Sequence, residues 1–289
     1  MHIDFKQFIE LELQKIHKNL KSFKWMSIDG GSINETYKVS TSTQNYFVKL
    51  NTKTVFENGF KEEVAGLQFL NENSALVPQV ILEGTFNNSV FLVLEWIDSG
   101  RETPVFWENF GKQLAKLHQH TYHQFGLNYP NFMGQLPQNN TFFDDFVSFF
   151  VENRLKPQVA LAYHNNLLTK QHVKHFENLY KQLPAIFPKE QPSAVHGDLW
   201  SGNFMCNTLQ KAILIDPAVY YGHREVDLAM STLFGGFSNQ FYETYNEVFP
   251  LEKGFEKRKN YYNLYPLLIH LNLFGSSYLK SITSIISYF

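Results

Sequence analysis

The chain has 289 residues, which is enough for one large domain or two smaller domains with a substantial hydrophobic core. Its composition, 44% hydrophobic and 18% charged, is that of an ordinary globular protein. The formal net charge of −2 gives no electrostatic reason to expect nucleic acid or an anionic membrane as a partner, and it favours a small, neutral or cationic substrate.

Cysteine usage and the N-terminal segment predict the compartment. The single cysteine, Cys206, excludes an internal disulfide and a thiol-based zinc site, which favours a reducing cytoplasm. Residues 1–20 mix charged and apolar side chains and have neither the apolar core of a signal peptide nor the length of a membrane span. We therefore expect a cytoplasmic protein without a nucleic-acid or membrane partner, either a monomer or a homodimer.

In chain order, the first predicted element is an amphipathic helix within residues 1–20, where apolar residues recur at near-helical spacing. Aromatic and β-branched runs then predict three strands, a helix with Phe60, Val64 and Leu67 on one face, and two further strands. The five predicted strands are Lys24–Ile28, Thr36–Ser40, Tyr46–Leu50, Gln79–Leu82 and Val90–Trp96.

A change of pattern after Trp96 indicates a domain boundary. The segment Ile97–Gly100 is short and turn-like, and from Trp107 to Leu117 the apolar spacing is helical. We therefore predict an α+β protein with a small, strand-rich N-terminal lobe of residues 1–97 and a larger, mainly helical C-terminal lobe of residues 98–289.

The strongest chemical signal is the segment His196–Asn203, followed thirteen residues after Asn203 by Asp216. Phosphoryl transfer requires a carboxylate that orients the attacking hydroxyl, and oxygen ligands that hold magnesium against the phosphates. Asp198 fits the first role, and Asn203 with Asp216 fits the second, at the spacing of a kinase catalytic loop. Each residue alone fits an ordinary turn better, but their joint spacing favours a site.

A glycine-containing segment lies between the first two predicted strands. Its residues Gly30, Gly31, Ser32 and Asn34 would let backbone N–H groups approach the phosphates of ATP. Two adjacent glycines alone more often form only a hairpin turn. The segment therefore supports a nucleotide site only in combination with the other motifs.

A lysine and a glutamate follow in the order that a kinase requires. Lys49 lies on the third predicted strand and Glu63 on the following helix, where a lysine contacts the α- and β-phosphates and a glutamate orients it. Solvated surface charges would explain both residues equally well, and Glu62 competes with Glu63 for the role. We predict the pair Lys49–Glu63.

The last N-terminal strand ends where a kinase presents its backbone to adenine. Glu95, Trp96 and Ile97 close this strand before the helical region begins. Backbone contacts leave little trace in a sequence, and an ordinary buried strand explains the same residues. We include the three residues in the predicted ATP site.

The sequence around these residues closely resembles the fructosamine (ketosamine-3-) kinase family, which is related to aminoglycoside phosphotransferases and choline kinases. The resemblance rests on HGDLWSGN at His196–Asn203 and DPAVYYGHREVDLA at Asp216–Ala229. It extends through LFGGF at Leu233–Phe237, FGLNYPNFMGQLPQNN at Phe125–Asn140 and the segment Gly275–Leu279, and so covers nearly the whole chain.

The resemblance implies a two-lobed, protein-kinase-like fold with a small antiparallel sheet in the N-terminal lobe, and ATP and Mg2+ as cofactors. It further implies phosphorylation of the 3-hydroxyl of ketosamines, which are ribulosamine, erythrulosamine or fructosamine adducts of amines or protein lysines. The phosphorylated product is unstable and releases the amine, so the implied role is deglycation.

Three further residues have predicted roles near the catalytic loop. Trp200 either stacks on the sugar or the amine of the substrate, or anchors the loop by packing. His196 is predicted to be a hydrogen-bonded scaffold residue, and Asp227 a structural acceptor that orients the backbone of the loop.

Two other functions compete with ketosamine phosphorylation. An aminoglycoside- or choline-type kinase would need acidic residues for its cationic substrate, and residues 228–289 contain only four, Glu243, Glu247, Glu252 and Glu256. A catalytically inactive nucleotide-binding module would be expected to have lost Lys49, Asp198, Asn203 or Asp216, and all four are present.

A cluster of histidines, His118, His120 and His123, suggests a metal site at first sight. The spacing of two and three residues across a helix end fits structural zinc poorly, and no acidic or thiol partner lies nearby in the sequence. We therefore do not expect a metal there.

Overall fold

The computed structural model describes residues 3–28, 34–53 and 60–289, and it separates into two compact units. The first unit comprises Met1–Ala65 and Val77–Asp98, and the second comprises Gly66–Leu76 and Ser99–Phe289. The sequence-based division at residues 97 and 98 lies beside the later of these boundaries. It did not anticipate that Gly66–Leu76 would group with the second unit.

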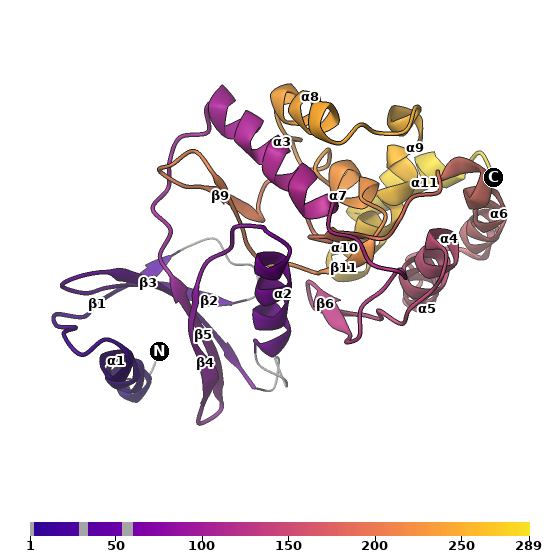
Figure 1. The fold of residues 1–289 in the computed structure, drawn as a ribbon. Helices are drawn as coiled ribbons and strands as arrows, with labels where there is room; N and C mark the ends of the chain where they lie inside the picture. The colour runs from indigo at the N-terminus through magenta and orange to yellow at the C-terminus, as the bar shows by residue number, and fades with distance from the viewer. Residues whose placement is uncertain (1–2, 29–33, 54–59) are drawn as a thin grey trace. The chain divides into compact units, whose positions relative to one another are not determined.

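The first unit is built on an antiparallel sheet of five strands in the order β1-β2-β3-β5-β4 (Figure 1). All five strands occur where the sequence predicts them, with ends that differ by a few residues. Their bounds are β1 Lys24–Ile28, β2 Glu35–Ser40, β3 Asn45–Thr52, β4 Val80–Phe86 and β5 Ser89–Glu95.

Helix α1, Ile3–Ile16, covers one face of this sheet, as its amphipathic pattern requires. Phe5, Ile9 and Leu13 are buried against Val48 of β3 and Val93 of β5. The sheet therefore has a dry core on the side of α1. Helix α2, Lys61–Glu72, follows β3 and crosses the boundary between the two units.

The second unit is mainly helical and contains three short two-stranded antiparallel sheets, β6-β7, β8-β11 and β9-β10. Its strands are β6 Asn131–Met133, β7 Leu136–Gln138, β8 Ser193–Val195, β9 Phe204–Cys206, β10 Ala212–Leu214 and β11 Tyr220–Gly222. Its helices are α3 Pro104–His118, α4 Phe146–Phe150, α5 Lys156–His164, α6 Lys170–Ile186, α7 Glu225–Met230, α8 Asn239–Val248, α9 Phe255–Tyr262, α10 Leu264–Phe274 and α11 Leu279–Ile286, with a π-helical turn at Val151–Leu155 and a 3-10 turn at Ser276–Tyr278. Among the described residues, no helix has the length and apolarity needed to span a membrane.

Helix α3 begins at a side-chain cap, since the Thr103 hydroxyl accepts a hydrogen bond from the Phe106 N–H and Pro104 occupies the first turn. It then packs closely on α8 at Gly111. A Cβ at Gly111 would lie 2.6 Å from the Phe241 carbonyl oxygen and 3.0 Å from the Tyr245 backbone nitrogen. The two helices can approach this closely only because residue 111 lacks a side chain.

We predict that Gly111→Ala lowers the Tm by about 3–8 °C, because the added methyl group must push α3 and α8 apart. The higher helix propensity of alanine, worth about 1 kcal/mol, opposes this loss but does not cancel it. Differential scanning calorimetry measures the change. Lys116→Ala, on the exposed face of the same helix, is the control and should change the Tm little; a Tm of Gly111→Ala at or above that of the wild type would contradict the packing argument.

Candidate active site

In the first unit, Lys49 of β3 forms an ion pair with Glu63 of α2. The Lys49 Nζ lies 2.8 Å from the Glu63 Oε1, and the two side chains are 8% and 16% exposed. The structure therefore selects Glu63 over Glu62 as the partner of this lysine. A buried ammonium that is ion-paired with a carboxylate has a defined position, which is what contact with a phosphate group requires.

The glycine segment is only partly within the described residues. Gly30, Gly31 and Ser32 lie outside them. Asn34 is described, and its Oδ1 accepts a hydrogen bond of 2.8 Å from the Asn51 Nδ2 of β3. This bond ties the start of β2 to the strand that carries Lys49.

At the end of β5, two of the three backbone N–H groups are bonded within the chain. The Glu95 N–H donates to the Gln79 carbonyl and the Trp96 N–H donates to the Asn45 carbonyl, at 2.9 and 3.3 Å. Within the described parts of the chain, the Ile97 N–H has no hydrogen-bond acceptor. An amide in this position is available to a planar heterocycle such as adenine.

In the second unit, the catalytic loop begins with a sharp turn at Gly197 after β8. Gly197 has a φ of +84°, and a Cβ there would collide with the Ala218 carbonyl, so only glycine fits. The turn directs two backbone N–H groups toward Asp227 of α7. The His196 N–H donates to Asp227 Oδ2 at 2.7 Å and the Gly197 N–H to Asp227 Oδ1 at 2.9 Å, the hydrogen bonds that the predicted role of Asp227 requires.

His196 is fully buried and hydrogen-bonded on both ring nitrogens. Its Nδ1 accepts from the Asp198 N–H at 3.2 Å, and its Nε2 donates to the Ile215 carbonyl at 3.0 Å. Burial lowers the pKa of His196, so the ring stays neutral at physiological pH. The residue links the loop to the segment before Asp216 and has no free nitrogen for acid–base chemistry, in agreement with a scaffold role.

Asp198 and Asn203 are brought together at the centre of the loop. The Asn203 Nδ2 donates to both the backbone carbonyl and the Oδ2 of Asp198, at 2.8 Å in each case. Because the amide NH2 group is used in this way, Oδ1 is the side-chain atom of Asn203 that can accept a further bond. The side chain of Asn203 is buried, so its orientation is fixed.

Burial raises the pKa of the Asp198 carboxyl to about 7. The hydrogen bond from Asn203 opposes the shift, while the negative charges of Asp216 and Asp227 add to it. A carboxylate with such a pKa is a better proton acceptor than a solvated aspartate and is still largely ionised above neutral pH. Its basicity therefore suits a group that accepts the proton of an alcohol.

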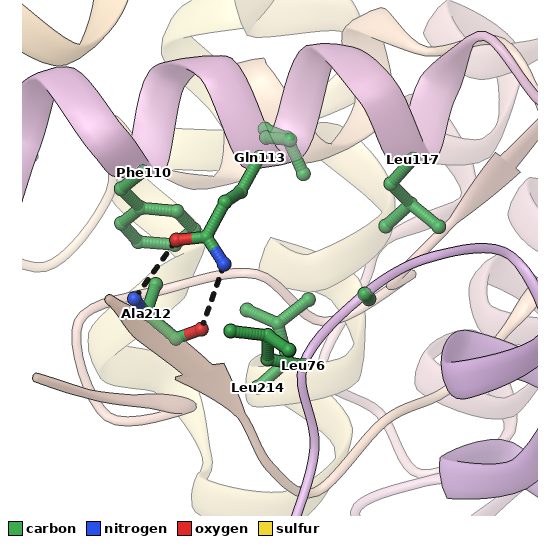
Figure 2. A pocket seen from close by; sticks show the side chains of 8 residues that line it. Leu76, Phe110, Gln113, Leu117, Ala212 and Leu214 are labelled. Atoms are coloured by element: carbon green, nitrogen blue, oxygen red, sulfur yellow. Dashed lines mark hydrogen bonds between the residues drawn. The ribbon is translucent and has the colours of Figure 1, made fainter. Parts of the chain in front are cut away.

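Asp216 follows the hairpin of β9 and β10, as the sequence predicts. It is exposed and adopts a φ of +51°, in the left-handed region that aspartate tolerates better than most residues. The start of β10 is held by Gln113 of α3, whose Oε1 accepts from the Ala212 N–H at 3.0 Å and whose Nε2 donates to the Ala212 carbonyl at 3.4 Å (Figure 2). The cavity beside this contact measures about 10 Å3, which is too small for any ligand larger than water.

Trp200 is half-buried, and its ring meets the ring of Phe234 edge-on at 5.8 Å. Phe234 in turn lies 4.7 Å from the ring of His270. The indole is thus packed on one side and accessible on the other. This geometry is compatible with both predicted roles, stacking on a substrate and anchoring the loop.

Sequence reasoning missed a buried polar network next to the site. The fully buried Arg154 donates to the Asn140 Oδ1 at 2.6 Å, and Asn140 donates to the Asn131 Oδ1 at 3.0 Å. Asn131 and Gln138 then donate to the backbone carbonyls of Val219 and Ala218, respectively. The network fixes the chain just after Asp216. The family-like segment Phe125–Asn140 contains three of its members, but their spacing gave no indication of a shared target.

The histidine cluster includes a contact that is not visible in the sequence. His118 is the last residue of α3 and is fully buried, and its Nε2 lies 3.1 Å from the Asp227 Oδ2. It therefore does have an acidic partner, 109 residues away in the sequence. Among the described residues no cluster of three or more histidine, cysteine and acidic side chains could hold a metal ion.

Comparison with known proteins decides the family. The family model for fructosamine kinase matches residues 5–289. A protein named "Probable ketoamine kinase" from Enterococcus faecium is 37% identical over 282 residues, which cover 96% of this chain and 100% of the relative. The chain belongs to the fructosamine kinase family. It is accordingly an ATP-dependent phosphotransferase.

Other fructosamine kinase relatives agree in sequence and in structure. The protein-ribulosamine 3-kinase of Arabidopsis thaliana is 34% identical over 267 residues, covering 90% of this chain and 80% of the relative. A solved structure described as a fructosamine-3-kinase from Haemophilus somnus superposes with a TM-score of 0.85 at 29% identity, covering 97% of this chain and 96% of that one. An aminoglycoside phosphotransferase in complex with AMP-PNP and hygromycin B has a TM-score of 0.64 at 13% identity, covering 96% and 97% of the two chains, and shows the shared protein-kinase-like fold alone.

The raised pKa of Asp198 predicts a pH-dependent stability in this fructosamine kinase family member. Since the pKa in the folded chain, about 7, exceeds the ordinary value of 3.8, the group stabilises the fold when protonated, and this contribution is lost as the pH rises through 7. Asp198→Asn has no carboxyl group to titrate at this position, so its stability does not show this decrease with rising pH. In metal-free buffer, the stability of Asp198→Asn relative to the wild type should increase by on the order of 2 kcal/mol between pH 5 and pH 8.

Urea denaturation at the two pH values measures this difference. Asp144→Asn, at an exposed position of the same unit, is the control and should show no comparable increase. A stability difference for Asp198→Asn that is the same at both pH values would show that burial does not perturb this carboxyl.

Proposed function

We propose that the protein phosphorylates the 3-hydroxyl of ketosamines with ATP and thereby acts in deglycation. The observation that carries the proposal is the Asp198–Asn203 contact, in which a basic carboxylate is held by the NH2 group of a residue whose amide oxygen can still accept a further bond. Its setting in a chain related to ketoamine kinases and to a ribulosamine 3-kinase supports the substrate class. The proposed substrates are ribulosamine, erythrulosamine or fructosamine adducts of free amines or protein lysines.

In the proposed reaction, the 3-hydroxyl oxygen attacks the γ-phosphorus of ATP, the bond from that phosphorus to the β–γ bridging oxygen breaks, and ADP leaves. Asp198 accepts a hydrogen bond from the hydroxyl and takes its proton as the P–O bond forms. Such transfers depend on positioning more than on a strong base. Asn203 donates a hydrogen bond to the Asp198 carboxylate, and the Asp198 N–H donates one to His196. Together these two bonds hold the carboxylate in one orientation for this purpose.

The first unit supplies the proposed ATP contacts. Lys49, oriented by Glu63, contacts the α- and β-phosphates, and Gly30, Gly31, Ser32 and Asn34 form the phosphate-binding segment. The backbone at Glu95, Trp96 and Ile97 contacts adenine, and the N–H of Ile97, which has no acceptor among the described residues, supports this assignment.

Asn203 and Asp216 would hold the magnesium ion that accompanies ATP. Their donor set fits, because an amide oxygen and a carboxylate are hard oxygen ligands, and Mg2+ in kinases usually takes one or two such side chains together with phosphates and water. When bound, the ion neutralises charge on the phosphates. Trp200 would contact the sugar or amine of the substrate with its accessible face.

The phosphorylated ketosamine is unstable and releases its amine, so the proposed role is repair of glycated metabolites or proteins. The buried, unpaired Cys206 supports the proposal of a reducing, cytoplasmic compartment.

An ATP-consumption assay with Mg2+ tests the proposal with four candidate substrates: ribulose-lysine, fructose-lysine, choline and kanamycin. We expect turnover of a ketosamine alone. Asp198→Asn should reduce kcat by at least about 100-fold because it removes the proton acceptor. Circular dichroism of this variant serves as the control for folding. Omitting Mg2+ should abolish turnover in the wild type.

Turnover of choline or kanamycin without turnover of either ketosamine would reject the proposal and place the chain functionally with the related kinase families. An Asp198→Asn variant that is folded and retains full activity would reject the role of Asp198.

A pair of adjacent glutamates provides a matched test of the ATP site. Glu63→Gln keeps the shape of the side chain but removes the charge that orients Lys49. A charged hydrogen bond is worth about 1.5–3 kcal/mol, so kcat/KM for ATP should fall about 10- to 100-fold. Glu62→Gln, one position away on α2, should change it by less than about threefold. Equal effects of the two substitutions would contradict the assignment of Glu63.

A further inference from the structure

A buried histidine behind the catalytic loop has no part in the proposed chemistry. His118 at the end of α3 is completely inaccessible to solvent. Its two ring nitrogens contact side chains of two other helices, the Asp227 carboxylate of α7 and the Tyr245 hydroxyl of α8. Both distances, 3.1 Å to Asp227 Oδ2 and 2.8 Å to the Tyr245 oxygen, are those of hydrogen bonds.

The chemistry of the partners fixes the direction of these bonds. The Asp227 carboxylate already accepts the N–H groups of His196 and Gly197 and has only acceptor sites to offer. The His118 Nε2 must therefore carry a hydrogen and donate it to Oδ2. In a neutral imidazole the Nδ1 is then an acceptor, so the Tyr245 hydroxyl donates to it.

Tyr245 is itself buried and anchored. Its hydroxyl lies 3.5 Å from the Arg224 Nη1, and Arg224 forms two hydrogen bonds of 2.8 Å with the Glu190 carboxylate. Arg224 also donates to the backbone carbonyls of Phe249 and Pro250 after α8. The hydrogen bonds are thus donated in one direction. Arg224 donates to Tyr245, Tyr245 to His118, and His118 to the Asp227 carboxylate that accepts the amides of the loop.

The geometry assigns a specific task to the histidine. We propose that His118, supported by Tyr245, is a positioning residue for phosphoryl transfer, because it holds the Asp227 carboxylate in the orientation that accepts the amides of His196 and Gly197. This inference rests on the proposed function for its kinetic consequences. Asp198 follows Gly197 directly, so a rotation of the Asp227 carboxylate would displace the proton acceptor.

The physical reason is that a carboxylate can rotate about its last side-chain bond. If only the two backbone amides donated to it, the carboxylate would rotate whenever the loop that contains these amides moved. His118 adds a third donor from α3, a helix that lies outside the loop and packs on α8, so the carboxylate keeps its orientation when the loop moves. Misplacement of a reacting group by about 1 Å can reduce a rate 100-fold, so small rotations matter.

Two substitutions at position 118 distinguish the effect of the hydrogen-bond donor from the effect of side-chain packing. In His118→Gln, the Nε2 of glutamine can take the place of the imidazole Nε2 and donate to Asp227. His118→Met keeps a similar volume but has no donor. With the best ketosamine substrate, we expect His118→Met to lower kcat by about tenfold or more while KM for ATP changes less than about twofold, and His118→Gln to restore kcat to within about threefold of the wild type.

Amide hydrogen exchange by NMR provides a readout that does not depend on activity. In His118→Met, the exchange rates of the His196 and Gly197 amides should rise about tenfold, while the Leu127 and Tyr221 amides, bonded elsewhere in the same unit, keep their rates. If His118→Met does not fold, Tyr245→Phe, which removes one oxygen atom, should produce a smaller rise at the same two amides.

Several results would overturn the inference. One is a folded His118→Met with the kcat of the wild type, and another is an equal loss of kcat in His118→Gln and His118→Met. A uniform rise in exchange across all four amides would show that His118 only stabilises the fold. If the wild type phosphorylates no ketosamine, the proposed function fails, and the exchange rates of His196 and Gly197 still decide whether His118 holds the loop.

Discussion

In the second unit, the site depends on one buried carboxylate that accepts hydrogen bonds from two backbone N–H groups. The turn at Gly197 takes the His196 and Gly197 amides out of the ladder of β8, and buried amides without acceptors are strongly destabilising. Asp227 satisfies both of them from α7. The position of Asp198, the next residue, is then determined. The Asp198 carboxylate accepts a hydrogen bond from the Asn203 amide, and the Asp198 N–H donates to the His196 ring, so the rest of the loop is tied to this position.

Helix α3 supports both halves of this arrangement without containing any residue that reacts. Gln113 holds the start of β10, the strand that leads to Asp216, and His118 contacts Asp227. The close approach to α8 at Gly111 places the helix where both contacts form. In this protein the geometry of the loop therefore depends on helices outside it as well as on the residues of the loop.

The parts of the structure that were predictable from the sequence are those that depend on neighbours in the chain. The aromatic and β-branched runs of β1 to β5, and the spacing of Asp198, Asn203 and Asp216, are local patterns. The partner of Lys49 was narrowed to two adjacent glutamates because helix and strand follow one another directly. The contact of His118 with Asp227 was not visible because the two residues are 109 apart in the sequence. The network of Arg154 was missed because its acceptors are neutral amides and carbonyls with no charge pattern. Long-range hydrogen bonds to the backbone leave no periodicity to read.

The division of α2 between the two units has a consequence for the order of folding during synthesis. Gly66–Leu76 groups with the second unit, where the Phe69 ring lies 5.1 Å from that of Tyr221 and the Leu76 carbonyl accepts the N–H of Leu214 at 2.8 Å. On the ribosome these partners emerge roughly 7 to 30 seconds after the segment, at about 5–20 residues per second. The strands of the first unit are complete at Glu95, well before that time. A segment in the middle of the early-folding sequence must therefore remain without its final contacts until most of the chain has been made.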